Sequence, residues 1–221
     1  MTLEKIQLEH VPSNIHIYAT LFRDVSNADF LHSQLLARNP DFEYAFVDAS
    51  SVISRFHLLS AVYAAVNALV TGTLRTPNVH SEIVVSLNTN NNIADAYRRW
   101  GITPGKTKDL IVVKVVVAPE VSSTETTSSP TKDKPTTQEQ QQQQQQPEDE
   151  QQSIWTHLTT HVKGTPSELS DANLAPLTDW PKVRKYYRLN AVPALAGCKD
   201  DEEKRRQEER LAVMGMALKG L

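Results

Sequence analysis

The order of hydrophobic and polar positions predicts alternating strands and helices in the first half of the chain. Short stretches of alternating or β-branched apolar residues predict strands at 15–22, 44–48, 81–87 and 110–117. Between them, apolar residues at helical spacing predict helices at 27–37, 52–70 and 91–100. Gly72 and Gly101 follow two of these helices, where glycine is a favoured stop. This order predicts an α/β fold, with α+β as the alternative, in which helices cover one mixed sheet.

The pattern after residue 152 is mainly helical. A short helix is expected at 153–161, and a second within 177–189, beginning near Pro181, because proline is favoured in the first turn. The last stretch, 200–221, is rich in good helix formers and has acids at its start, where they complement the helix dipole. We therefore expect the chain to end in a long helix.

The stretch 119–152 interrupts this pattern. It is rich in Ser and Thr, then in Gln, with an unbroken glutamine run at 140–146, and it has almost no apolar residues. Such a segment cannot bury enough surface to offset the entropy of ordering it. We predict a disordered surface insertion. Neither flank looks complete alone, so we expect 1–118 and 153–221 to form one domain together.

Composition and charge narrow the classes of protein. The chain has 221 residues, 39% of them hydrophobic, and a net charge of −3. The predicted insertion carries seven acids and two lysines, so the remainder is slightly basic. The single cysteine, Cys198, excludes an internal disulfide and fits the nucleus or cytoplasm. The longest apolar run, 111–118, is too short to span a membrane, and we expect no secretory signal.

Sequence motifs for catalysis are absent. The chain has no dinucleotide-binding or phosphate-binding glycine motif, no nucleophile elbow and no kinase catalytic-loop signature. His157 and His161 would share a helix face, but Leu158 stands where a metalloprotease has glutamate, and no third ligand is indicated. We therefore expect no catalytic residue, no metal and no cofactor.

The most distinctive stretch is 81–102, which has four asparagines just before a predicted helix: Asn88, Asn90, Asn91 and Asn92. Capping explains one or two of them, because Asn is an excellent N-cap. The alternative is a contact with an anion or a nucleotide, since the N-terminus of a helix offers free N–H groups and positive potential. From position alone, capping is the favoured interpretation.

Several segments in order resemble one known family. The run through Asn90-Asn91-Asn92-Ile93 to Ile102, followed by the strand 109–113, is similar to the TPRKB family. The resemblance continues in Leu74-Arg75-Thr76 and in the stretches 21–28, 162–164 and 183–189, so it covers nearly the whole chain except the insertion. Members of this family are small α/β proteins.

The resemblance implies a function. TPRKB-like proteins are non-catalytic subunits of the EKC/KEOPS complex, which makes N6-threonylcarbamoyladenosine beside the anticodon of tRNA. The chain is then expected to bind the PRPK-type kinase subunit directly and support its activity. It would reach the other KEOPS subunits through that kinase, help hold the tRNA 3′ end, and bind no membrane. Fungal relatives are also tied to telomere maintenance.

The expected C-terminal helix has two apolar faces. One stripe is formed by Leu211, Met214, Leu218 and Leu221, and Val213 and Ala217 lie nearly opposite. A helix that is apolar on two faces needs two partners, so one face is expected to cover the home sheet and the other to bind the kinase. Homodimerisation, or burial of both faces within the domain, is the alternative.

Candidate tRNA contacts begin with Arg75, which falls on the matching arginine of the family. The other candidates are the exposed polar and basic side chains that could reach phosphates: Asn90, Asn91, Asn92, Lys106, Lys108, Lys182, Arg184, Lys185 and Arg188. Two further functions compete with the KEOPS interpretation, a free-standing RNA-binding protein and a small-molecule-binding α/β domain. A deep pocket with convergent ionisable groups would favour the small-molecule class.

Overall fold

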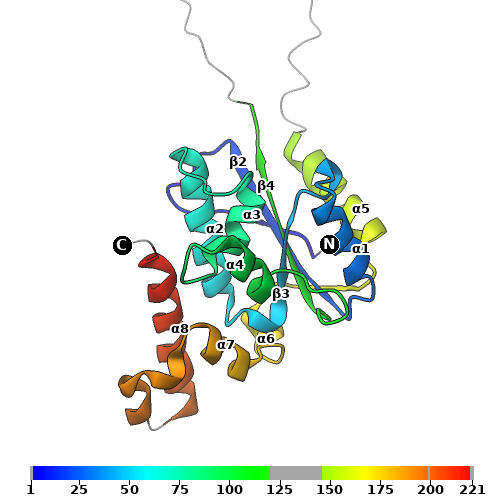
Figure 1. Cartoon of the computed structure of the whole chain (residues 1–221). Coiled ribbons are helices and arrows are strands. Elements are labelled where there is room, and N and C mark those ends of the chain that lie inside the picture. The colour runs from blue at the N-terminus through cyan, green and yellow to red at the C-terminus, as the bar shows by residue number, and fades with distance from the viewer. Residues whose placement is uncertain (1, 120–145, 199, 220–221) are drawn as a thin grey trace, which may run out of the picture.

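The structure is a computed structural model that describes residues 2–119, 146–198 and 200–219 (Figure 1). Its centre is a five-stranded sheet of order β1-β2-β4-β3, in which β5 also pairs with β2. The strands are β1 (Glu4–Ile6), β2 (Ile15–Arg23), β3 (Ala45–Asp48), β4 (Leu110–Val117) and β5 (Thr165–Ser167). The α/β fold is confirmed. All described strand pairs are antiparallel, however, so the expectation of a mixed sheet was wrong.

Helices cover both faces of the sheet (Figure 1). One face carries α2 (Arg55–Val70), α3 (Val79–Ser86) and α4 (Ile93–Trp100), and the other carries α1 (Ala28–Leu36) and α5 (Gln146–His161). Alternate residues of the central strands therefore enter two different cores. Ile17 and Val113 pack on the α2 side, whereas Tyr18 and Val112 pack on the α5 side.

The remaining elements are short helices and turns and the C-terminal helix. They are α6 (Asp171–Leu174), α7 (Trp180–Tyr186), α8 (Asp201–Ala217) and the 3₁₀ turns η1 (Pro40–Phe42), η2 (Ala49–Ser51), η3 (Leu189–Ala191) and η4 (Pro193–Gly197). Turn η1 lies beside α1 and α5, and the C-terminal helix α8 packs on α2. Pro181 lies in the first turn of α7 as predicted. Within the described ranges, no helix is both long and apolar enough to cross a membrane.

The prediction of a strand at 81–87 was wrong, because this stretch forms α3. Asn78 caps the helix by accepting a hydrogen bond from the Ser81 N–H at 2.8 Å. Ile83, Val84 and Val85 are all buried, as is Glu82. A helix buried on most sides has a continuous apolar run instead of an amphipathic stripe, so its pattern matches that of a buried strand.

The boundary of the insertion also differs from the prediction. Helix α5 begins at Gln146, seven residues before the expected start at 153. The predicted disorder of 119–152 falls mainly on 120–145, which lie outside the described residues. Asn27 stands at the N-cap position of α1 but makes no side-chain capping bond; its side chain donates to the His161 carbonyl at 2.7 Å and accepts from the Lys163 N–H at 2.9 Å. It therefore connects α1 to the end of α5.

Candidate functional site

Helix α8 packs on the body of the domain through one narrow stripe. Glu208, Ala212 and Met216 are buried and recur every four residues, so they lie on one face of the helix. This face lies against α2, with α7 near its N-terminal half (Figure 1). The sequence prediction placed the home face over the sheet; the structure places it over helices, because α2 and α3 already cover that side of the sheet.

A buried ion pair holds α8 to α7. The Arg184 guanidinium donates to both carboxylate oxygens of Glu208, at 2.6 and 3.1 Å, and the Glu208 side chain is only 1% exposed. The Trp180 ring has the Arg184 and Arg205 guanidinium groups at 5.6 and 5.5 Å from its centre. Arg184, predicted as a tRNA contact, thus has a structural partner.

The outward face of α8 is charged in its N-terminal half and apolar in its last turns. Met214 and Leu218 are each 56% exposed, and Leu211 lies half-buried at the edge of this face. Leu221, the fourth predicted member of the stripe, lies outside the described residues. We call Leu211, Met214 and Leu218 the outer stripe. Val213 and Ala217 lie on another side of the helix, as predicted, but they face a groove.

This groove, of about 810 Å³, lies between α2, α3, α8 and the loop after β1. Its walls are mainly apolar and include two exposed aromatic rings of α2, Phe56 and Tyr63. On the α8 side the wall consists of Val213, Met216, Ala217 and Lys219. Helix α8 therefore has the groove on one side and the outer stripe on another.

Charged groups converge in the groove. The Glu82 carboxylate accepts hydrogen bonds from the Arg75 N–H at 3.0 Å, the Thr76 N–H at 2.9 Å and the Thr76 hydroxyl at 2.7 Å. The Lys219 ammonium donates to the Val85 carbonyl at 2.6 Å. Burial, and secondarily the Arg75 charge, lower the pKa of Lys219 to about 8, although the Glu82 charge opposes them.

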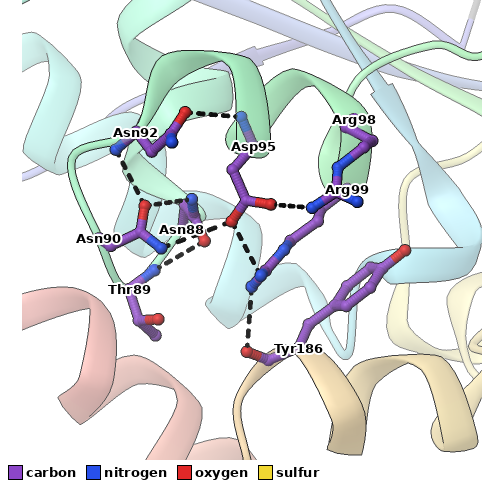
Figure 2. A network of polar contacts seen from close by, with 8 residues as sticks. All are labelled: Asn88, Thr89, Asn90, Asn92, Asp95, Arg98, Arg99 and Tyr186. Carbon is purple, nitrogen blue, oxygen red and sulfur yellow. Dashed lines mark hydrogen bonds and ion pairs between the residues drawn. The ribbon is translucent and has the colours of Figure 1, made fainter.

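The asparagine-rich turn is mostly self-contained (Figure 2). The Asn88 amide donates to the Asn90 side-chain oxygen at 2.9 Å, and the Asn92 N–H donates to the same oxygen at 2.9 Å. Asn92 caps α4 by accepting from the Asp95 N–H at 3.0 Å. Capping and turn formation therefore account for three of the four asparagines. The fourth, Asn91, is exposed, and its side-chain oxygen accepts from the Arg75 guanidinium.

Ion pairs fix this turn against its neighbours. The Asp95 carboxylate pairs with Arg98 and, at 2.8 Å, with Arg99 (Figure 2). Arg99 also donates to the Tyr186 carbonyl of α7 at 3.4 Å, with its guanidinium 5.3 Å from the centre of the Tyr186 ring. Asn91 therefore lies next to Arg75 in a turn whose other residues are held by hydrogen bonds and ion pairs.

The other predicted tRNA contacts lie elsewhere. Lys182 donates to Asp48 at 2.9 Å and to Ser50 at 2.8 Å, so it is occupied within the protein. Lys106 and Lys108 are exposed on the loop between α4 and β4, at the opposite end of α4 from the asparagines. The structure thus brings Arg75 and Asn91 together and adds Lys219, which sequence reasoning missed. No local motif marks Lys219, because only the tertiary fold brings it into the groove that Arg75 lines.

His157 and His161 belong to an aromatic cluster on the other side of the sheet. Their rings are 4.5 Å apart, and the His157 Nδ1 is hydrogen-bonded to the Tyr44 hydroxyl at 2.9 Å. Phe42 packs edge-on against both imidazoles. Within the described parts of the chain, no group of three potential metal ligands occurs. Packing explains this pair of histidines.

The fold and this site define a class of binding protein, in which one helix, α8, is held to α7 by an ion pair and exposes an apolar stripe beside a groove. The chain belongs to the CGI-121 family, whose description is kinase binding protein; the family's model matches residues 22–220. It is 53% identical to the EKC/KEOPS complex subunit cgi121 of Neurospora crassa and 48% to that of Gibberella zeae, over the full length of both chains in each case. It is 26% identical to the Schizosaccharomyces pombe subunit over 80% of this chain and 83% of that one.

Proposed function

We propose that this protein is the kinase-binding, non-catalytic subunit of an EKC/KEOPS complex and that it binds its kinase through the outer stripe of α8. The observation that carries this proposal is the exposure of Met214 and Leu218 on a helix held firmly by the Arg184–Glu208 pair. Family membership and the names of the relatives support the kinase and the complex as partners.

The physical argument concerns apolar area. Completely burying a Met or Leu side chain contributes about 1.5–3 kcal/mol. Because just over half of each side chain is exposed, a partner that covers both would gain roughly 1–1.5 kcal/mol from each. A pre-ordered helix also loses little entropy on binding, so these residues are suited to be the centre of an interface.

The test compares binding of the purified PRPK-type kinase by wild type, Met214→Glu and Leu218→Glu, using calorimetry and a pull-down. Each variant would bury an unpaired carboxylate, and we expect affinity to fall at least about tenfold, or 1.4 kcal/mol. Leu36→Glu is the matched control, because Leu36 is 73% exposed on α1, on the other side of the sheet. Equal binding by all folded variants would refute docking through α8. No binding by wild type would refute kinase binding itself.

We further propose that the groove beside Arg75 receives the single-stranded 3′ end of tRNA, which would bring the substrate of the modification to the complex. Phe56 and Tyr63, 61% and 42% exposed, can stack with bases, and Arg75 with Asn91 can bind the backbone. Arg75→Ala is expected to weaken tRNA binding several-fold. The double variant Lys106→Ala, Lys108→Ala tests the other surface; a larger loss there would place the contact away from the groove.

The groove also bears on the alternative of a small-molecule enzyme. Its buried acid, Glu82, accepts three hydrogen bonds from its own chain at one carboxylate oxygen, Oε2, so its main contacts are structural and hold the Arg75–Thr76 segment against α3. This favours a binding role. Localisation to the nucleus and cytoplasm, and a part in telomere maintenance, stay predictions from the resemblance.

A further inference from the structure

The proposed function assigns no role to Lys219. It is the last described residue of the chain, it is half-buried, and it lines the same groove as Arg75. Its ammonium donates to the carbonyl of Val85, one residue before the end of α3. The C-terminal end of a helix carries partial negative charge, so it stabilises a cation there.

Both cations keep donors for a ligand. An ammonium has three N–H groups, and the described contacts of Lys219 use one of them, on Val85. Arg75 uses one guanidinium nitrogen on Asn91, and among the described residues no other acceptor contacts its guanidinium. Two side chains with unused donors in one groove can bind the same oxyanion.

The cluster of Arg75, Glu82 and Lys219 holds two cations and one acid, while Glu9 brings the formal charge of the whole groove lining to zero when Lys219 is protonated and His10 neutral. Glu82 balances one of the two cations, so the cluster of Arg75, Glu82 and Lys219 carries a net charge of +1 when Lys219 is protonated and zero when it is not. The other ionisable groups that line the groove are Glu9 and His10, from the loop after β1, and Tyr63 from α2. All three come from the N-terminal loop or α2, whereas Lys219 bonds to α3.

We propose that Lys219 and Arg75 form a phosphodiester-binding subsite of the groove and that Lys219 binds in its protonated form. This inference rests on the proposed function, because it assigns the backbone of the RNA 3′ end to these two residues. It adds a contact from α8 itself, the helix that also carries the outer stripe. It further makes binding of RNA depend on the uptake of a proton.

The pH dependence of RNA binding follows from the pKa of Lys219 in the protein without RNA. Because the pKa of Lys219 is lowered to about 8, the amine loses its proton between pH 7 and pH 9. A phosphate beside the ammonium favours the charged form, so binding takes up a proton and affinity falls as pH rises. If only the protonated form binds, the protonated fraction, and hence the affinity, falls about tenfold from pH 7 to pH 9.

The experiment measures binding of a short single-stranded RNA by fluorescence anisotropy. The probe has the sequence of a tRNA 3′ end and contains only cytidine and adenosine, whose bases do not titrate in this range, with a rhodamine label. Wild type is expected to lose about tenfold in affinity from pH 7 to pH 9. Lys219→Arg, which keeps its charge, is expected to change less than about twofold over the same range. Lys219→Met should bind weakly at both pH values.

The controls separate this inference from the proposed function. His10→Gln should keep the wild-type pH response, and circular dichroism at both pH values should show that every variant is folded. If wild type and Lys219→Arg respond equally to pH, the subsite is refuted while RNA binding stands. If wild type fails to bind the probe and also whole tRNA at pH 7, the proposed RNA function is refuted, and this inference with it.

Discussion

Tyr187→Phe is predicted to destabilise the protein strongly, because one hydroxyl completes a buried chain of hydrogen bonds. The Ile53 N–H donates to His57 Nδ1 at 3.2 Å, so the other ring nitrogen carries the proton. His57 Nε2 then donates to the Tyr187 oxygen at 2.6 Å, and the Tyr187 hydroxyl donates to the Leu87 carbonyl at 2.7 Å. This chain connects the start of α2, the end of α7 and the start of the asparagine-rich turn.

The magnitude follows from the groups left without partners. Removing the hydroxyl leaves the His57 N–H and the Leu87 carbonyl unsatisfied, and both residues are 0% exposed. An unpaired buried polar group costs about 1–3 kcal/mol, so we expect a loss of about 2–5 kcal/mol in the free energy of unfolding. The ring itself stays, so little of this loss comes from a cavity.

Urea denaturation at pH 7.5 measures the difference in the free energy of unfolding between wild type and Tyr187→Phe. An equal slope of this free energy against urea concentration shows that the two proteins unfold in the same way. Tyr63→Phe is the matched control, because Tyr63 is exposed on α2, and it should lie within about 0.5 kcal/mol of wild type. If Tyr187→Phe also lies within that margin, the buried chain of hydrogen bonds does not stabilise the fold, and the argument is wrong.

Three further predictions concern stability and the position of α8. Burial lowers the pKa of His57 and of His80 to about 3, so both are neutral in the folded state and take up a proton on unfolding at pH 5. The free energy of unfolding, measured by urea denaturation, should therefore fall by about 2 kcal/mol for each histidine between pH 7 and pH 5. Gly215→Ala places a methyl group 3.2 Å from the Thr89 methyl, so this variant alone should change stability little. Combined with Thr89→Ser, which removes that methyl, it should raise the free energy of unfolding by about 1 kcal/mol, measured by thermal unfolding. Glu208→Gln breaks a buried ion pair and should cost about 2–4 kcal/mol while also weakening kinase binding.

Elements with a clear sequence period or a long β-branched run could be predicted from the sequence. Helix α4 has an exposed polar side, and strand β2 alternates clearly although both of its faces are buried. Strand β4 is a continuous β-branched run that the structure places in the middle of the sheet. Helix α3 could not be predicted, because burial on most sides removes the polar positions that mark a helix. The antiparallel sheet could not be predicted either, since removing the false strand at 81–87 changes which strands are neighbours.

The candidate site shows the same division between local and tertiary information. The outer stripe follows from spacing within α8 alone, and the structure places Met214 and Leu218 on the exposed face. The role of Arg184 does not follow from spacing, because a basic residue on a short helix is usually solvated, and only the fold brings the buried Glu208 to it. Arg75 and Lys219 line the same groove because Lys219 reaches α3, which follows Arg75 closely in sequence but lies far from Lys219.

Helix α8 carries residues of both proposed binding surfaces, so the place of a substitution on this helix decides which kind of binding is affected. Met214 and Leu218 face outward, whereas Val213 and Lys219 line the groove, so substitutions on either side should affect kinase binding and RNA binding separately. Glu208 instead fixes where the whole helix lies, against α7. A substitution at Glu208, or one larger than alanine at Gly215, where an added Cβ already lies 3.2 Å from the Thr89 methyl, should weaken both kinds of binding together. A single displaced helix, and not two separate lesions, would then explain a variant defective in both.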